Sequence, residues 1–266
     1  MKTAIGRRVG GMLVLACALV LSACASRNFG ADREEAVSSE KQEIQRRASI
    51  RMQLAISYYQ QGQYKVALDE IKQVLLISSD LADAYAVRAL IFMDMGETRL
   101  ADDNFQYALK LAPNNIDYAN NYGWFLCQTD HEKQGLTYLE KVLRDPTYTM
   151  PGKAYNNAGL CSLRLKDVAS AERYFTQGFR VDPSNPGINA NLAKIHFDRG
   201  EVDQAQFYIN RVIKVDVLTA DVLWLAIKIE KRLGDDAAVN GLAMQLRKRY
   251  PNSREFGFLQ RGLFNE

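Results

Sequence analysis

The apolar residues of this chain follow a pattern that returns about every 34 residues. Within each period they recur at spacings of three and four, as Tyr85, Ala89 and Phe92 do, which places them on one stripe of a helix. Each period holds two such stripes, separated by a turn residue such as Gly96. The pattern therefore predicts a series of helix pairs joined by short turns. A small or short apolar residue marks the same place in each period: Ala67, Ala101, Gly135, Ala171, Ala205 and Val239.

A period of 34 residues that contains a helix, a turn and a second helix is the signature of tetratricopeptide repeats. One such pair cannot bury its own apolar face, so consecutive pairs stack into a continuous core. We therefore expect an all-α tetratricopeptide repeat solenoid that winds as a right-handed superhelix. Its six helix–turn–helix units span residues 48–81, 82–115, 116–149, 152–185, 186–219 and 220–253.

Two places depart from this regular period. Met150 and Pro151 are extra residues between the third and fourth units, and we expect them to widen the turn there. The tail, residues 254–266, carries apolar residues at helical spacing. We expect it to form a final helix that caps the exposed end of the stack, as repeat arrays generally need.

Residues 1–23 resemble a bacterial signal peptide rather than a repeat. Basic residues precede an apolar run at 12–21 that is too short to span a bilayer. The run leads into the sequence LSAC at 21–24, which resembles a bacterial lipobox. That resemblance implies cleavage before Cys24 and acylation of this cysteine, whereas the alternative is an ordinary signal peptide followed by a chance cysteine. Residues 24–47 are then expected to form a polar tether.

The residues after the lipobox bear on localisation. Ala25 and Ser26 follow the cysteine, and neither resembles the aspartate of an inner-membrane retention signal. The resemblance therefore implies an outer-membrane lipoprotein that faces the periplasm. Several acyl chains on one cysteine make a firm anchor, since a single chain binds a membrane only marginally.

Removal of the signal peptide changes the charge of the protein. The complete chain holds 34 basic and 31 acidic residues. Cleavage removes three basic residues, Lys2, Arg7 and Arg8, and no acidic one, which leaves 31 of each sign. The mature protein is therefore close to neutral, and its charge predicts no binding of nucleic acid.

The cysteines fall into two groups. Cys17 lies in the signal peptide and Cys24 in the lipobox, which leaves Cys127 and Cys161 for the mature fold. These two lie 34 residues apart, on the first helices of neighbouring predicted units. An oxidising compartment allows a disulfide between them. We favour that disulfide over the alternative of two buried thiols.

The sequence contains no recognisable catalytic motif. Its two histidines, His131 and His196, lie far apart in the repeat order, and we expect the first in a turn and the second in or near the core. The chain has no phosphate-binding loop, no nucleophile elbow and no Cys or His spacing typical of a metal site. We therefore predict a protein that is not an enzyme, needs no cofactor or metal and takes no small-molecule substrate.

In tetratricopeptide proteins the first helix of each unit lines a concave groove. Carried over to this chain, the groove positions are apolar in the amino-terminal units and more basic in the carboxy-terminal units. An apolar groove flanked by polar residues suits an amphipathic helix or an extended apolar peptide. The alternative for Met52, Ile56 and Tyr59 is that they pack under the tether helix. The positions that the resemblance implies for partner binding are Met52, Ile56, Tyr59, Ala86, Leu90, Met93, Asn120, Trp124, Asn156 and Leu160, and the same register also gives Gln128, Leu163, Arg164, Lys194, Phe197, Trp224, Lys228 and Lys231.

Two segments narrow the resemblance further. Residues 120–127 read NNYGWFLC and residues 154–161 read AYNNAGLC, so each carries paired asparagines, a glycine and a cysteine. Together with the lipobox, the tether and the six repeats, they resemble the type IV pilus biogenesis and stability lipoproteins of the PilF/PilW type over the whole chain. The resemblance implies a pilotin, which is a lipoprotein that binds subunits of the type IV pilus secretin and promotes their outer-membrane localisation and multimerisation.

Two alternative functions fit the same sequence. One is a tetratricopeptide scaffold of another envelope machine, such as an outer-membrane protein assembly or peptidoglycan synthesis complex. The other is a repeat protein that recruits or activates a periplasmic enzyme. Both would bind proteins through the same helical surfaces.

Overall fold

The computed structural model describes residues 42–264, and every regular element in that range is a helix. None of these helices combines the length and the apolar character that a membrane crossing requires. The predicted signal peptide, the lipidation site at Cys24 and most of the predicted tether lie outside the described residues. For the described part of the chain, the all-α tetratricopeptide solenoid expected from the 34-residue period is confirmed.

The chain divides into two compact units, Met1–Met95 and Gly96–Glu266. The division falls inside the second predicted repeat, between its first and second helices. Nothing in the sequence marks this point, because Gly96 is an ordinary turn residue of the repeat.

The first unit consists of helical residues 42–60 followed by α2 (Tyr64–Ile77) and α3 (Ala82–Asp94). Gly62 makes the turn before α2 with a φ of 71°, in the left-handed region that suits glycine. The side chains of the repeat pattern point into a common core, so the period read from the sequence describes real packing. The fully buried residues of this core are Ala55, Ala67, Ile71, Val74, Ala84 and Ile91.

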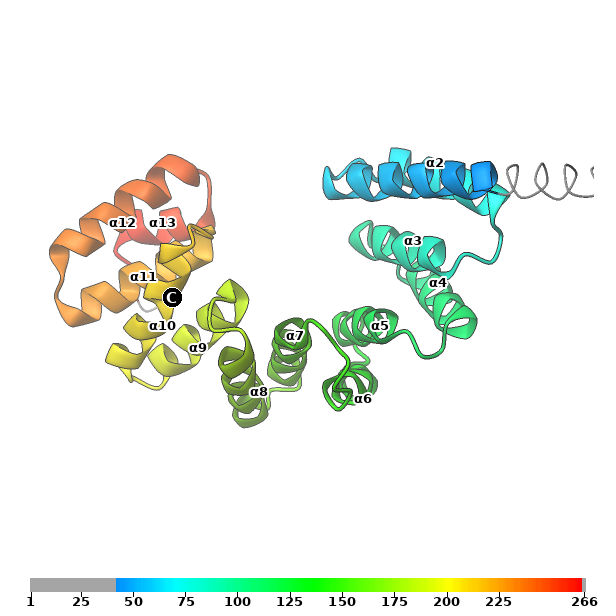
Figure 1. The fold of residues 1–266 in the computed structure, drawn as a ribbon. Helices are drawn as coiled ribbons and strands as arrows, with labels where there is room; N and C mark the ends of the chain where they lie inside the picture. Colours follow the sequence, from blue (N-terminus) through cyan, green and yellow to red (C-terminus); the bar gives the residue numbers. More distant parts are fainter. Residues whose placement is uncertain (1–41, 265–266) are drawn as a thin grey trace, which may run out of the picture. The chain divides into compact units, whose positions relative to one another are not determined.

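The second unit contains the remaining helices. The first helices of predicted repeats three to six are α5 (Ile116–Gln128), α7 (Pro151–Arg164), α9 (Pro186–Asp198) and α11 (Ala220–Leu233). The second helices of repeats two to six are α4 (Thr98–Leu111), α6 (Glu132–Leu143), α8 (Val168–Val181), α10 (Val202–Lys214) and α12 (Asp236–Arg249), and α13 (Arg254–Arg261) follows the last repeat. Within this unit the first helices lie on one side of the stack and the second helices on the other (Figure 1).

Residues at the helix starts explain several of these bounds. Asn115, Asn185 and Ser253 precede α5, α9 and α13, and the side-chain oxygen of each accepts a hydrogen bond from a backbone N–H of the first turn. Pro151 and Pro186 are the first residues of α7 and α9. Proline suits that position because its missing N–H would have no partner within the helix.

The connection between repeats three and four is widened, as the two extra residues predict. The loop 144–150 is longer than the loop 182–185 at the equivalent point one repeat later. Met150 lies in this loop, and Pro151 is the first residue of α7, a position that suits proline.

Small residues at the repeat position bring the two helices of a unit into close contact. Gly135 on α6 is the tightest example: a Cβ there would lie 2.5 Å from the carbonyl oxygen of Gly123 on α5 and 2.6 Å from the sulfur of Cys127. Ala171 and Ala205, at the same position of later repeats, are fully buried. At Gly135, Ala171 and Ala205 the repeat marker is therefore a close helix contact, whereas Val239 of the last repeat is larger and only partly buried.

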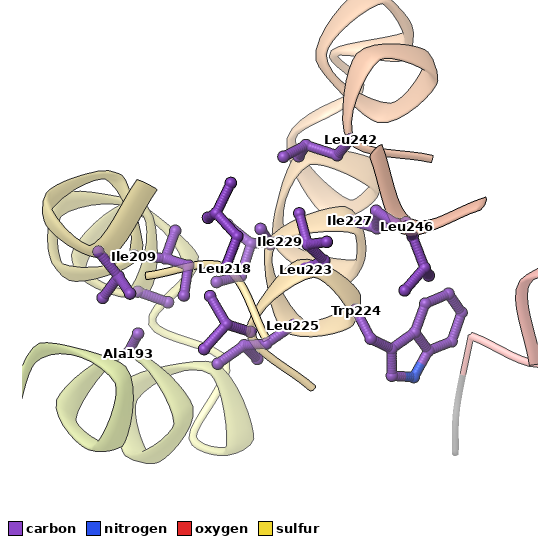
Figure 2. Packing of buried hydrophobic residues seen from close by; sticks show 14 of the residues in the cluster. Ala193, Ile209, Leu218, Leu223, Trp224, Leu225, Ile227, Ile229, Leu242 and Leu246 are labelled. Atoms are coloured by element: carbon purple, nitrogen blue, oxygen red, sulfur yellow. The ribbon is translucent and has the colours of Figure 1, made fainter. Parts of the chain in front are cut away.

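A large buried cluster surrounds α11, and Figure 2 shows residues of α9, α10 and α12 converging on it. The helix expected in the tail is present as α13, which packs against α11 and α12. The ring centre of Trp224 on α11 lies 6.2 Å from that of Phe258 on α13 and 5.4 Å from that of Phe264. These aromatic contacts hold the tail over the last repeat.

Candidate partner-binding groove

A hollow of about 510 Å³ opens on the first-helix side of the second unit. We call this space the hollow. It is lined mainly by α9 and α11, with Leu160 from α7 and Glu255 from α13. It therefore lies among the first helices of repeats four to six, on the surface that tetratricopeptide proteins offer to partners.

Small side chains at the start of α9 leave this space open. Pro186 and Gly187 form the first turn of α9, Ala190 comes one turn later, and all three line the hollow. Leu160 and Trp224 supply apolar walls from the helices on either side. Larger side chains at these positions of α9 would fill the space between α9 and α11, so the small residues account for the hollow.

Two lysines line one side of the hollow, and the acidic residues Asp221 and Glu255 also line it. The Nζ of Lys194 donates to a carboxylate oxygen of Asp198 at 2.8 Å, one turn along α9. The Nζ of Lys228 lies 5.5 Å from the ring centre of Phe197 and 5.8 Å from that of Trp224. Burial lowers the pKa of Lys228, the nearby charge of Lys194 lowers it further, and Asp198 opposes both effects. A partner that brings hydrogen-bond acceptors to this side would find two ammonium groups.

No comparable hollow separates α5 from α7 in the described structure, because direct contacts join these two helices. A disulfide joins Cys127 to Cys161 with a Cα–Cα distance of 5.3 Å, so the bond favoured from the sequence is present in the structure. The Nδ2 of Asn157 on α7 donates to Oδ1 of Asn120 on α5 at 3.3 Å. The two helices are therefore held together by a covalent bond and by a buried polar contact.

Asn120 is a sequence-predicted groove residue that the structure places elsewhere. It is fully buried, and its Nδ2 donates to Oδ1 of Asn121 at 3.3 Å. Because both ends of its amide bind neighbouring asparagines, Asn120 holds α5 against α7 and is not available to a partner. The prediction that it lines the groove is wrong, since family register alone does not separate a residue facing the groove from one facing the next repeat.

Three other predicted groove residues of the second unit, Trp124, Asn156 and Leu160, are partly exposed. Trp124 packs against the buried cluster around the disulfide, and Leu160 lines the hollow. The Oδ1 atom of Asn156 is buried and has no hydrogen-bond partner among the described residues. Trp124 and Leu160 therefore lie where a partner could reach them, whereas the unpaired oxygen of Asn156 is closed to solvent.

In the first unit the predicted groove residues are divided between core and surface. Met52 and Tyr59 pack against the core of their own unit, and the Tyr59 hydroxyl donates to Asp94 at 2.7 Å. Burial, together with Asp94, raises the pKa of Tyr59, so the phenol keeps its proton. Ala86 is only 5% exposed, and its assignment to partner binding is wrong because it is buried. The remaining three, Ile56, Leu90 and Met93, are partly exposed.

The carboxy-terminal groove positions also differ from one another. Trp224 is only 5% exposed, because α13 and the tail cover it, so it forms a wall of the hollow rather than an accessible groove residue. Arg164 is exposed and pairs with Asp130 at 3.4 Å and with Glu132 at 3.3 Å. Leu163 and Phe197 are partly buried, whereas Gln128, Lys194 and Lys231 are exposed.

The histidines have structural surroundings. His196 is buried, stacks on Tyr208 with ring centres 5.3 Å apart and hydrogen-bonds Glu201. This hydrogen bond lowers the pKa of the Glu201 carboxyl. His131 lies in the turn that precedes α6. In the part of the chain that the structure describes, no group of His, Cys, Asp and Glu side chains is arranged to hold a metal ion.

Sequence reasoning missed the residues at the start of α9. Gly187, Ala190 and Asn191 line the hollow but do not belong to the predicted groove set. One signal was present in the sequence: Asn121, Asn156 and Asn191 lie 35 residues apart. Each is also the sixth residue of its helix, in α5, α7 and α9.

Comparison with known proteins agrees with this architecture. Tetratricopeptide repeat models match residues 82–115 and 162–223. The chain is 28% identical over 205 residues to the type IV pilus assembly protein PilF of Pseudomonas aeruginosa, an alignment that covers 77% of this chain and 81% of that protein.

Solved structures agree as well. The crystal structure of PilW, a widely conserved type IV pilus biogenesis factor, is 32% identical and matches with a TM-score of 0.69 over 80% of this chain and 98% of that one. A structure of Pseudomonas aeruginosa PilF is 27% identical and has a TM-score of 0.72 over 82% of this chain and 99% of that one.

The helix pairs, their period and the matched repeats define a tetratricopeptide repeat protein, a class that binds other proteins through stacked helices. Within that class the chain belongs to the PilF/PilW family of type IV pilus biogenesis proteins.

Proposed function

We propose that this chain is an outer-membrane lipoprotein that acts as a pilotin in type IV pilus biogenesis. It binds subunits of the pilus secretin and promotes their localisation and multimerisation in the outer membrane. The observation that carries the proposal is the identity of 28% to a type IV pilus assembly protein over 77% of the chain. The hollow supports it by offering a surface for a protein partner, and the LSAC sequence at 21–24 supports it by offering an anchor.

The mechanism is physical rather than chemical. Acyl chains on Cys24 hold the repeats at the membrane, and the tether, residues 24–47, lets them reach a neighbouring subunit. A secretin subunit bound by the repeats is then concentrated on the membrane where it must assemble. The disulfide between Cys127 and Cys161 fixes α5 against α7, so a partner meets a preformed surface and less order has to be created on binding.

The test compares two cysteines of the amino-terminal region. Cells carrying Cys24→Ala lose the acylation site, whereas cells carrying Cys17→Ala change a cysteine of the predicted signal peptide and keep that site. Inner and outer membranes are separated, and the secretin is run on gels without boiling to distinguish multimer from monomer. We expect Cys24→Ala to lose the outer-membrane multimer while the repeat protein itself is still present, and Cys17→Ala to keep it.

Normal secretin multimers both in Cys24→Ala cells and in cells that lack the whole protein would contradict the proposal. In that case a scaffold of another envelope assembly becomes the better account, and general envelope defects in the deletion strain would point to it.

A further inference from the structure

We propose that the second helices of the second unit carry a docking site of their own, formed by α8 and α10 around Arg211. The site takes an acidic segment of a partner protein. A carboxylate of the segment binds the Arg211 guanidinium, and a neighbouring apolar side chain packs on Phe207. The inference goes beyond the proposed function, since it concerns the side of the stack opposite the first helices (Figure 1).

An aromatic cluster joins α8 to α10 on this side. The ring centre of Phe179 on α8 lies 6.2 Å from that of Phe207 and 5.3 Å from that of Tyr208, both on α10. Phe207 is nevertheless 50% exposed. A single exposed ring is common on protein surfaces, but this one lies beside a guanidinium.

Two aromatic rings hold the guanidinium of Arg211. Its central carbon lies 4.3 Å from the ring centre of Phe207 and 5.4 Å from that of Phe179. A guanidinium is planar and stacks favourably on aromatic faces. The orientation of the Arg211 side chain is therefore set before a partner arrives, which lowers the ordering cost of binding.

The terminal nitrogens of Arg211 remain open to a partner. Within the residues that the structure describes, Arg211 forms no hydrogen bond and no ion pair, but only its Nε atom is both unpaired and buried. The side chain as a whole is partly exposed. Nη1 and Nη2 can therefore offer two parallel N–H donors, the arrangement that binds a carboxylate at both of its oxygens.

The equivalent gap one repeat earlier holds a carboxylate of its own. There the hydroxyl of Tyr174 on α8 donates to Glu140 on α6 at 2.7 Å. Tyr208 occupies the place of Tyr174 in α10, since each is the seventh residue of its helix. The place of Glu140, the ninth residue of α6, is held in α8 by Thr176. Between α8 and α10 the fold thus lacks the carboxylate that it supplies between α6 and α8, and a partner can bring one.

The charges of the two helices favour an acidic partner. Together α8 and α10 carry four basic and two acidic residues. One of the acidic residues, Glu172, is already bound to Arg199 at 2.5 Å, and the other, Asp203, lies in the first turn of α10. Arg180 and Lys214 are exposed in the last turns of α8 and α10. Their charges add to that of Arg211 and attract a segment of opposite sign.

A protein segment fits this site better than a membrane surface does. An anionic membrane attracts many cations spread over one face. Here a single guanidinium has a fixed orientation, and a fixed fork of donors suits the geometry of one carboxylate. Arginine and aromatic side chains are also the residues enriched at protein–protein interfaces.

The first experiment identifies the segment by photocrosslinking in cells. A benzophenone amino acid replaces Gln204, an exposed residue of α10 that shares a helix face with Phe207 and Arg211. Mass spectrometry locates the crosslinked segment. We expect a protein segment in which Asp or Glu lies beside an apolar residue. Its yield should fall in Arg211→Gln and stay unchanged in Arg247→Gln, the matched control, because Arg247 is an exposed arginine on α12.

The second experiment measures the affinity of that segment. It is synthesised as a fluorescent peptide and titrated against the full-length lipoprotein in detergent micelles, with fluorescence anisotropy as the signal. Arg211→Gln should weaken binding about tenfold or more, as the loss of a charge-assisted pair of hydrogen bonds does. Arg211→Lys should lie between Arg211→Gln and the wild type, since lysine keeps the charge but lacks the planar fork.

A second peptide separates recognition from a structural effect of the substitution. It carries the amide, Asn or Gln, in place of the acidic residue. It should bind the wild type about as weakly as the acidic peptide binds Arg211→Gln, and Arg211→Gln should not weaken it further. If Arg211 only shaped the surface, Arg211→Gln would weaken both peptides by the same factor, and the inference would be overturned.

The crosslinking result can also overturn the inference. It does so if position 204 gives no protein product, or if the product contains phospholipid or a second copy of this chain. A crosslinked segment without an acidic residue would have the same consequence. None of these outcomes bears on the proposed function, which the secretin multimers of the Cys24→Ala cells test separately.

Discussion

Two pairs of first helices in the second unit use the same repeat in opposite ways. We call α5 and α7 the closed pair, because a disulfide and the hydrogen bond from Asn157 to Asn120 join them. We call α9 and α11 the open pair, because the hollow lies between them. Both pairs are built from the same helix–turn–helix repeat, with two extra residues, Met150 and Pro151, between the units of the closed pair, so the repeat pattern alone does not decide whether a gap between repeats is filled or left open.

The difference comes from a few residues outside the repeat pattern. In the closed pair, buried cysteines and asparagines meet face to face. In the open pair, Gly187 and Ala190 present little side chain to the gap. Small residues inside each unit let its two helices pack closely and so fix the positions of the helices. The residues between units then remain available either for stability or for binding.

Loss of the disulfide between Cys127 and Cys161 should have the greatest effect on stability in the closed pair. Replacing both Cys127 and Cys161 by Ala should lower the free energy of unfolding by about 3–4 kcal/mol, because the disulfide closes a segment of 34 residues in the unfolded chain. Urea unfolding of the wild type and the double variant, with and without reductant, measures this. Reductant should destabilise the wild type and leave the double variant unchanged. A wild type that is indifferent to reductant would show that the bond does not stabilise this pair.

The next effect tests the small residues that position helices within a unit. Gly135→Ala should destabilise the protein by about 1–3 kcal/mol, the usual cost of overpacking. The new Cβ would lie 2.5 Å from the carbonyl oxygen of Gly123, which is backbone and cannot turn away.

Gly241→Ala is the matched control, since a Cβ at this helical glycine of α12 would meet nothing within 4 Å. It should stabilise the protein by about 0.5–1 kcal/mol through the gain in helix propensity and the smaller entropy of the unfolded chain. Equal shifts of the urea midpoint in the two glycine variants would mean that close helix contact at Gly135 does not control stability.

A third substitution tests the open pair. Ala190→Phe places a ring in the hollow and should lower secretin capture about tenfold, the scale on which a central contact of an interface acts. Ala169→Phe, at an exposed alanine of α8 on the opposite side of the stack, is the matched control and should bind normally. Pull-down titrations with purified secretin give both affinities, with thermal melts to verify folding. Equal capture by both variants would remove the hollow from the binding surface.

The smallest effect concerns the polar contact that joins α9 to α10. His196 hydrogen-bonds Glu201 and lowers its carboxyl pKa, so this contact adds stability above the unfolded glutamate pKa of about 4.3. That contribution is lost as the pH falls through the folded pKa. Glu201→Gln should therefore lower the thermal midpoint slightly at neutral pH, and the difference from the wild type should shrink as the pH falls below about 4. A difference that stays constant across this range would mean that the carboxylate charge plays no part.

The sequence predicted the helices well because their determinants are local. Small markers such as Ala171, turn residues such as Gly96 and caps such as Asn185 act over a few residues, so their effects can be read without tertiary contacts. The division after Met95 has no comparable signal, because the residues around it follow the ordinary repeat.

The candidate site was predicted less well because exposure depends on neighbouring repeats. Asn120 and Ala86 occupy groove positions but are buried, which register alone does not reveal. Gly187 and Ala190 create the hollow by having little side chain, and a search for apolar or charged side chains passes over them.

Binding of the partner at the hollow, on the first-helix side of the second unit, can be tested by site-specific photocrosslinking in cells. A benzophenone amino acid is placed either at Asn191 in the hollow or at Met244 on α12, whose side chain is 69% exposed. We expect a crosslinked product containing the secretin from position 191 and none from position 244. A secretin crosslink from position 244, with none from position 191, would show that the partner binds elsewhere.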